Sequence, residues 1–196
     1  FNLDFRGPDI DEVTVDGQPA DWSRDGGELT ITPQTPLAEG TTFDVAVRYH
    51  GMPDGGDDRF EKGWWATGNS VFAVGEPRGS DVWYPVNGHP LDKATYTLEI
   101  TVPEKFEVVA NGHRREVSIA DGLNGQSTRT FIWENDEPTA SYLVMFHAAE
   151  MDVSIEERPD GITLLEAFPP SVDAQSRAAF DAVPDMLDYF ESILGP

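Results

Sequence analysis

The 196-residue sequence contains no cysteine, so disulfide bonds, thiolate chemistry and cysteine-ligated zinc sites are excluded. Lysine is scarce, and Lys62, Lys93 and Lys105 are the only ones. No apolar run reaches the roughly 18 residues that a membrane-spanning helix needs, and the first residues lack the pattern of a signal peptide. We therefore expect a soluble chain without a transmembrane or signal segment. The sequence leaves the compartment unknown.

Recognisable catalytic motifs are also missing. There is no His-Glu-x-x-His, no Gly-x-Ser-x-Gly and no phosphate-binding or dinucleotide-binding loop. The four histidines lie far apart, without the spacing of metal ligands: His50, His89, His113 and His147. We therefore expect no catalytic residue and no bound metal in this chain.

Positive charge is in short supply. Asp and Glu number 36 against 13 Lys and Arg, which gives a formal net charge of −23. Such a surface repels phosphate backbones, so nucleic acid is excluded as a partner. A solvated acidic surface that keeps the protein soluble is the simplest interpretation.

Residues 1–157 have the pattern of many short strands separated by turns. Alternation of apolar and polar residues is clear in 42–49 and 95–102, and Asp16–Gly17 and Asn111–Gly112 are strong turn signals. Strand spacing of about ten residues favours an antiparallel β-sandwich or a strongly curved, saddle-like sheet. The predicted fold is therefore mainly β.

The last forty residues change character. One more strand is expected at 161–168, and then the apolar period changes to that of a helix over 171–194. The expected apolar face contains five large side chains: Phe180, Val183, Leu187, Phe190 and Leu194. Pro184 should kink or split this helix, and Gly195 should end it.

Two loops contain residues with functional potential. Trp64 and Trp65 are expected on a glycine-flanked loop, where they either plug the end of the sandwich or contact a partner or ligand. Glu76 lies between Gly75 and Pro77, and is either an exposed turn residue or a carboxylate held on a stiff loop and aimed at a cation.

The stretch from Glu76 to Gly112, "EPRGSDVWYPVNGHPLDKATYTLEITVPEKFEVVANG", closely resembles the amino-terminal β domain of zinc aminopeptidases of peptidase family M1. Similar segments follow the same order elsewhere: "LDFRG" at 3–7, "VTVDGQPADW" at 13–22, "VAVRYHGMP" at 45–53 and "PTASYLVMF" at 138–146. The resemblance implies an amino-terminal β domain at 1–157, lacking its first strands. It also implies that 158–196, one strand and one helix, begin a thermolysin-like catalytic domain that is truncated before the zinc motif.

The resemblance further implies a zinc-dependent aminopeptidase that removes N-terminal residues from peptides. This chain would wall the active-site cleft and be inactive alone, with the zinc held in the missing catalytic domain. Only one site position carries over from the family: Glu76, which would bind the substrate's free α-amino group. The family's usual Gln two residues earlier is replaced here by Val74, and its usual acidic residue at position 88 by Gly88.

A non-catalytic β-sandwich that acts as a binding or interaction module is the alternative. It would dock a partner through Trp64–Trp65 and the 76–93 loop; a carbohydrate-binding sandwich is a weaker variant, based on aromatic residues alone. The expected partners of the chain are a peptide N-terminus and the missing catalytic domain. In the truncated chain we also expect self-association through the C-terminal helix.

Overall fold

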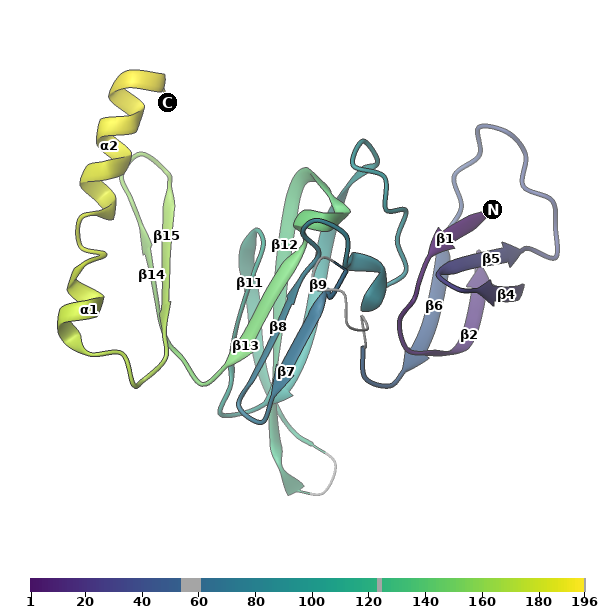
Figure 1. Cartoon of the computed structure of the whole chain (residues 1–196), viewed down its shortest axis with the longest axis horizontal. Coiled ribbons are helices and arrows are strands. Elements are labelled where there is room, and N and C mark those ends of the chain that lie inside the picture. Colours follow the sequence, from purple (N-terminus) through teal and green to yellow (C-terminus); the bar gives the residue numbers. More distant parts are fainter. Residues whose placement is uncertain (54–60, 123–124, 196) are drawn as a thin grey trace. The chain divides into compact units, whose positions relative to one another are not determined.

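The structure is a computed structural model that describes residues 1–53, 61–122 and 125–195 (Figure 1). It divides into two compact units. The first contains Phe1–Glu104 and Val108–Ala148, and the second contains Lys105–Glu107 and Ala149–Pro196. Each unit is described separately below.

Two small sheets form the N-terminal part of the first unit. One sheet has the order β1 (Asn2–Asp4), β5 (Glu28–Thr32), β4 (Asp21–Asp25), and the other has the order β3 (Gln18–Pro19), β2 (Asp9–Val15), β6 (Val45–His50). Alternate residues of β5 and β6 are apolar, so each of these strands turns one side inward. The buried side chains form one cluster: Phe5, Val13, Val15, Leu29 and Ile31. This part is a small sandwich with its own core.

The rest of the first unit also consists of two sheets. One has the order β10 (Glu107–Ala110), β13 (Met145–Ala149), β8 (Ser70–Val74), β7 (Trp64–Thr67), and the other has the order β11 (His113–Asp121), β12 (Ser127–Ala140), β9 (Lys93–Pro103). β12 lies between β9 and β11 and pairs with both in antiparallel fashion. Phe131 and Trp133 on β12 are fully buried, as are Ala73 on β8 and Val108 on β10.

The predicted turns occur, with different roles. Asp16 and Gly17 both have positive φ and close the β2–β3 hairpin. Asn111–Gly112, in contrast, connects β10 to β11, which belong to different sheets. The Asn111 side chain holds this connection, because its Oδ1 accepts from the Met145 backbone N–H at 2.6 Å.

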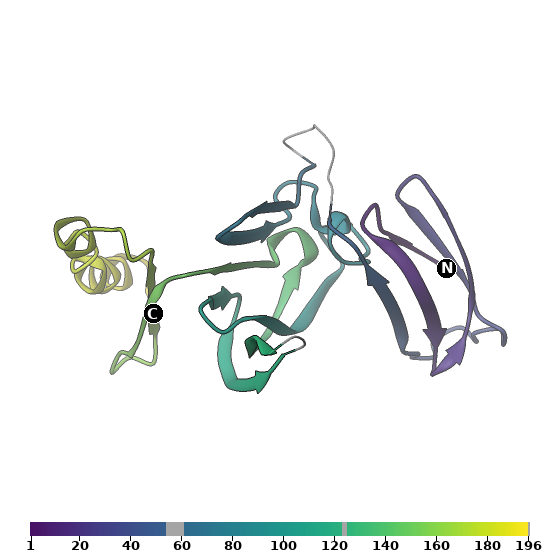
Figure 2. The same cartoon turned by 90° about the horizontal axis from the view of Figure 1, so that it is seen from below.

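The second unit contains a hairpin and two helices (Figures 1 and 2). β14 (Asp152–Glu157) pairs with β15 (Thr163–Phe168) in antiparallel register. The segment predicted as one helix is divided into α1 (Ala174–Ala178) and α2 (Val183–Leu194). Pro184 lies in the first turn of α2, where a missing N–H costs nothing, so the helix splits rather than kinks.

α2 leaves much of its apolar surface exposed. Val183 and Leu187, on the predicted apolar face, are half-buried, but Phe190 is 54% exposed and Leu194 is 80% exposed. Other large exposed side chains of this helix widen the surface: Met186, Tyr189 and Ile193. No residue of α1 or α2 is fully buried.

The predicted fold class is confirmed: strands in several antiparallel sheets are the main secondary structure, and helical structure follows at the C-terminal end. The division into domains at residue 157 stays a prediction. Within the described residues, no helix combines the length and the apolarity that crossing a bilayer would require.

Candidate functional site

The loop that follows β8 carries the one site residue predicted from the sequence. Glu76 is exposed, and its neighbours Gly75 and Gly79 are buried. The Glu76–Pro77 peptide bond is cis. Within the part of the chain that the structure describes, the Glu76 carboxylate makes no hydrogen bond or ion pair, so it is available to a ligand.

Gly75 is needed because the loop passes very close to another segment. A Cβ atom at position 75 would lie 2.1 Å from the Ser80 Oγ and 2.8 Å from the Tyr142 Cα. The Ser80 hydroxyl also donates to the Ser141 carbonyl at 2.8 Å, deep in the protein. One end of the loop is therefore pressed against residues 141–142 without room for a side chain.

The loop also crosses the chain just before β7. A Cβ atom on Gly63 would lie 1.7 Å from the Gly79 carbonyl oxygen, and one on Gly79 would lie 2.7 Å from the Gly63 Cα. The Val74 N–H donates to the Gly63 carbonyl at 3.1 Å. Two glycines thus permit a backbone crossing that any larger residue would prevent.

A half-buried arginine ties the other end of the loop. The Arg6 guanidinium donates to both carboxylate oxygens of Asp81, at 2.6 and 2.8 Å, and to the Glu61 carboxylate at 2.8 Å. Its backbone N–H donates to the Asp81 carbonyl at 2.8 Å. Arg78 pairs with the other oxygen of Glu61 at 3.1 Å. The hydrogen bond that Arg6 donates to Asp81, followed by the nearby charges of Asp81 and Glu61, raises the pKa of Arg6 above its ordinary value.

A small cavity of about 160 Å³ lies against this loop. The loop itself contributes Pro77, Arg78, Gly79, Ser80 and Asp81, and Arg6 and Tyr142 are among the residues across from it. Because part of the loop borders open space, apolar packing alone does not hold it there. Its position depends on the polar contacts of Arg6 and Ser80.

The segment after the loop is ordered by local hydrogen bonds. Val86 forms a two-way backbone bridge with Asp4, and the Gly88 N–H donates to the Asp4 carboxylate at 2.8 Å. His89 Nδ1 accepts from the Leu91 N–H at 3.2 Å, so its role in the structure is that of a loop hydrogen-bonding residue. These contacts hold the chain that enters β9.

Known proteins share the fold of this chain. No protein-family model matches the sequence. A stretch of 116 residues, 59% of this chain, is 28% identical to human glutamyl aminopeptidase, and the match covers 12% of that protein. The solved structure of an M1 zinc metallopeptidase from Deinococcus radiodurans matches with a TM-score of 0.83 and 22% identity, over 100% of this chain and 45% of that one.

A third similar protein is Legionella pneumophila aminopeptidase A, solved in complex with aspartic acid. It matches with a TM-score of 0.78 and 18% identity, over 100% of this chain and 23% of that one. The fold is that of the M1 zinc metallopeptidases. The resemblance seen in the sequence is confirmed at this level, and the chain spans less than half the length of each of these proteins.

The sequence suggested that the two tryptophans lie on a loop, and this prediction is wrong. Trp64 and Trp65 begin β7, which pairs with β8 so that Trp64 is opposite Ala73 and Trp65 is opposite Phe72. The turn between these strands is Gly68–Asn69, a residue pair typical of two-residue hairpin loops. The Trp64 ring meets Phe146 edge-on at 5.6 Å, so it belongs to the packing of this sheet.

A partly buried tyrosine, Tyr84, also contacts the segment beneath the loop. The Tyr84 hydroxyl donates to the Ser141 carbonyl at 3.0 Å, the same acceptor that Ser80 uses. Burial, and then the proximity of Tyr96, raises the pKa of Tyr84 well above its ordinary value. Tyr84 therefore stays neutral and serves as a donor that fixes Ser141 beneath the loop.

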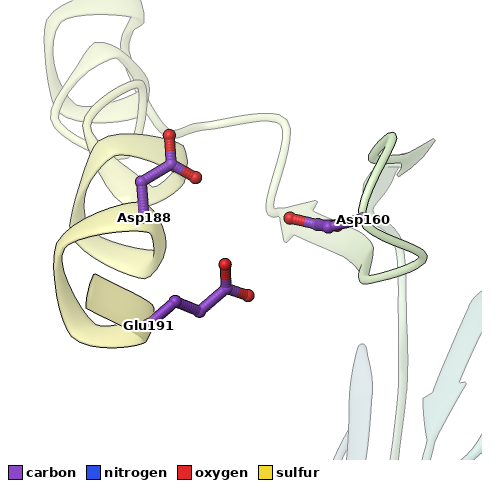
Figure 3. Close-up of side chains that lie close together, drawn as sticks. All are labelled: Asp160, Asp188 and Glu191. Carbon is purple, nitrogen blue, oxygen red and sulfur yellow. The ribbon is translucent and has the colours of Figure 1, made fainter. Parts of the chain in front are cut away.

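Three carboxylates of the second unit approach one another closely (Figure 3). Ligand atoms of Asp160, Asp188 and Glu191 lie within 4.8 Å of each other. Arg158 already pairs with two of them: it contacts Asp160 at 2.6 Å and also bonds to Asp188. The hydrogen bond from Arg158 lowers the pKa of Asp160. This cluster is therefore explained as an arginine-centred link between the hairpin and α2.

The described residues do not offer a zinc site. The group just discussed is the one set of three or more possible ligands that lie close enough in the described part of the chain, and it contains carboxylates only. Carboxylates alone suit hard cations, whereas catalytic zinc sites include histidine. Three of the histidines contact other groups: His50 contacts Asp11, His89 accepts from Leu91, and His147 lies 3.0 Å from the Ser70 Oγ.

Sequence reasoning selected Glu76, whose role stays a prediction, but missed the residues that hold its loop. Arg6 is 75 positions from Asp81 and 55 from Glu61, so no local pattern could pair them. The glycines at 63, 75 and 79 were visible in the sequence, and their clustering around one loop was the available signal. Which backbone each glycine approaches needed the tertiary structure.

Proposed function

We propose that this chain is the amino-terminal part of a zinc-dependent aminopeptidase. The observation that carries the proposal is the fold match over 100% of the chain to an M1 zinc metallopeptidase, at a TM-score of 0.83. The match covers 45% of that protein, which leaves room for a metal-binding part outside the region shared with this chain. On this proposal, the boundary near residue 157 separates the β domain from the start of the catalytic domain.

In this role the β domain walls the cleft, and Glu76 binds the free α-amino group of the peptide. An ammonium group that leaves water needs an anionic partner, because an unpaired charge in a desolvated cleft is costly. Glu76 fits this requirement for two reasons: its carboxylate has no partner among the described residues, and its loop is held on both sides.

The zinc of such an enzyme would be bound by residues outside this chain. When bound, it would polarise the scissile carbonyl and activate a water molecule. The part of this chain that the structure describes supplies no suitable ligands, so its contribution is to bind and orient the substrate. We therefore expect the 196-residue chain alone to hold no zinc after dialysis and to cleave no aminoacyl substrate.

The experiment is kinetic and uses the longer protein of which this chain would be a part. Glu76→Ala should lower kcat/KM for aminoacyl chromogenic substrates by at least about tenfold, equivalent to roughly 1.4 kcal/mol from a charge-assisted contact. Glu76→Gln should have a smaller effect, because an amide oxygen still accepts a hydrogen bond. Thermal melting is the folding control, since an exposed carboxylate contributes about 0.5 kcal/mol or less.

An unchanged kcat/KM for Glu76→Ala, at an unchanged melting temperature, would reduce Glu76 to a surface turn residue. A longer gene product without any His-Glu-x-x-His motif would contradict the enzyme itself. In that case the alternative, a non-catalytic β-sandwich module, would gain support. That alternative is weakened by Trp64, whose ring packs against Phe146 and so offers little aromatic surface for a partner.

The exposed apolar surface of α2 has a role in the same proposal. It would receive the catalytic part of the longer protein, and in the isolated chain it would associate with a second copy. Phe190, Ile193 and Leu194 are each more than half exposed on this helix. Apolar surface of this extent is typical of a buried interface rather than of a solvated helix.

A further inference from the structure

We infer that Arg6 is a positioning residue for Glu76: through Asp81 and Glu61 it fixes the loop that presents the amino-group anchor. This inference rests on the proposed function, because it gives Arg6 a role in binding the substrate's ammonium group. Arg6 itself is remote in sequence from the loop and follows β1. Its effect on catalysis would be transmitted by the loop alone.

The geometry is that of a clamp with two arms. One arm is the pair of hydrogen bonds from Arg6 Nε and Nη2 to the two oxygens of Asp81. The other arm is the bond from Arg6 Nη1 to Glu61, whose second oxygen pairs with Arg78. A planar guanidinium can hold two carboxylates in fixed directions at once, which a lysine ammonium cannot do.

The clamp acts on the part of the loop that follows Glu76. Asp81 belongs to the short 3₁₀ helix Ser80–Val82 that ends the loop, and Arg78 is two residues from Glu76. The Arg6 Nη2 group also donates to the Arg78 carbonyl oxygen at 3.4 Å. Pro77 transmits this restraint toward Glu76, because its ring limits the backbone between residues 76 and 78.

The surroundings give the clamp a role. A cavity of about 160 Å³ borders Pro77–Asp81, so packing does not enclose this stretch on every side. The clamp is also sheltered: the exposed fractions of the Arg6, Asp81 and Glu61 side chains are 26%, 18% and 29%. Sheltered charge-assisted bonds are stronger than exposed ones, so they can define the position of a loop next to open space.

The test is a double-mutant cycle in the longer protein. Arg6→Lys should lower kcat/KM by about three- to tenfold through a higher KM, and Arg6→Ala should lower it by at least as much. When Glu76→Ala is already present, either Arg6 variant should lower kcat/KM by less than about a further twofold, because Arg6 and Glu76 act on the same contact with the substrate. A residue with a merely structural role would reduce activity equally whether or not Glu76 is present.

Arg24 supplies a matched control. It is also a partly buried arginine of the N-terminal sheets, and its Nη1 donates to the Gly7 and Pro8 carbonyls at 3.0 and 2.8 Å. Among the described residues it makes no hydrogen bond or ion pair with residues 75–82, so Arg24→Ala should leave kcat/KM within about twofold of the wild type. If Arg6→Ala fails to fold, Arg6→Lys decides, because it keeps the positive charge beside both carboxylates.

A second readout uses the 196-residue chain and needs no activity. The N–H groups of Val82, Trp83 and Tyr84 donate to the Gly79 and Ser80 carbonyls. Arg6→Lys should speed hydrogen exchange at these amides by about tenfold, whereas Arg24→Ala should not. Unchanged exchange in Arg6→Lys, or additive losses with Glu76→Ala, would overturn the role of Arg6 alone. No effect of Glu76→Ala would overturn the proposed function and this role with it.

Discussion

The two units of this chain bury their apolar residues to very different degrees. In the first unit, Phe5, Leu29 and Phe131 are completely buried, and sheets surround them. In the second unit, neither helix has a fully buried residue, and Leu194 is 80% exposed. The comparison teaches that strands in sheets can complete a core within the first unit, whereas the apolar helix of the second unit still needs a partner.

Polar contacts differ between the units in the same way. In the first unit, Arg6 joins residues that are 55 and 75 positions away, so its ion pairs connect separate parts of the fold. In the second unit, Arg158 joins Asp160 and Asp188, within a hairpin and the helix that follows it. The ion pairs of Arg6 thus join residues farther apart in sequence than those of Arg158, which span 2 and 30 positions.

The largest expected difference between the units comes from the same substitution made in each. Leu29→Ala should lower the free energy of unfolding by about 3 kcal/mol, because it removes buried methyl groups and leaves a cavity. Leu194→Ala, at the exposed end of α2, should change it by less than about 0.5 kcal/mol. Urea unfolding followed by far-ultraviolet circular dichroism measures both, because it reports the strands of the first unit and the helices of the second, and similar losses for the two variants would break the comparison.

Two glycines test whether the loop is as tightly placed as the structure indicates. Gly75→Ala should destabilise the first unit by about 1–3 kcal/mol, since its Cβ would meet the Ser80 side chain and the Tyr142 backbone. Gly68→Ala is the matched control, because no atom lies within 4 Å of the Cβ that it would add. Melting temperatures of both variants decide the matter, and a well-folded Gly75→Ala with wild-type stability would refute the close approach.

The smallest expected effect concerns association of the isolated chain. We expect weak, concentration-dependent self-association through α2, and the double variant Phe190→Ser with Leu194→Ser should abolish it by removing apolar contact area. Added salt should strengthen association in the wild type, because Asp185, Asp188 and Glu191 make the helix acidic. Sedimentation velocity at several protein concentrations provides the measurement.

A strictly monomeric wild-type chain at every concentration would show that the exposed face of α2 is tolerated in water. That result would contradict the conclusion that the apolar helix of the second unit needs a partner. The second unit would be stable with an apolar face that only a longer chain covers.

Local features of the fold could be predicted well from sequence. The alternation in 95–102 predicted β9, which extends over Lys93–Pro103, and the change of period near 171 predicted the helical segment. Asp16–Gly17 predicted a hairpin turn, and both residues adopt positive φ. These features depend on neighbours within a few residues, so a linear pattern contains them.

Other features depended on distant partners and were missed. β7 was predicted as a loop, because Trp64–Trp65 lacks a clear alternation, yet pairing with β8 makes it a strand. β4 escaped notice for a similar reason: Asp21–Asp25 is polar at most positions and is a strand because it pairs with β5. Edge strands of this kind take their conformation from hydrogen bonds to a neighbour rather than from their own side chains.

By itself, the sequence determined the mainly β architecture, the separate helical end and the choice of Glu76 as the candidate anchor. All three follow from local residue patterns or from a motif that is continuous in the chain. Tertiary structure alone decided that Arg6, Glu61 and Asp81 meet, that Gly63 and Gly79 cross, and that α2 keeps an exposed apolar face. Such contacts join segments far apart in sequence, and the free energy that selects them comes from packing and charge pairing that exist only once the chain has folded.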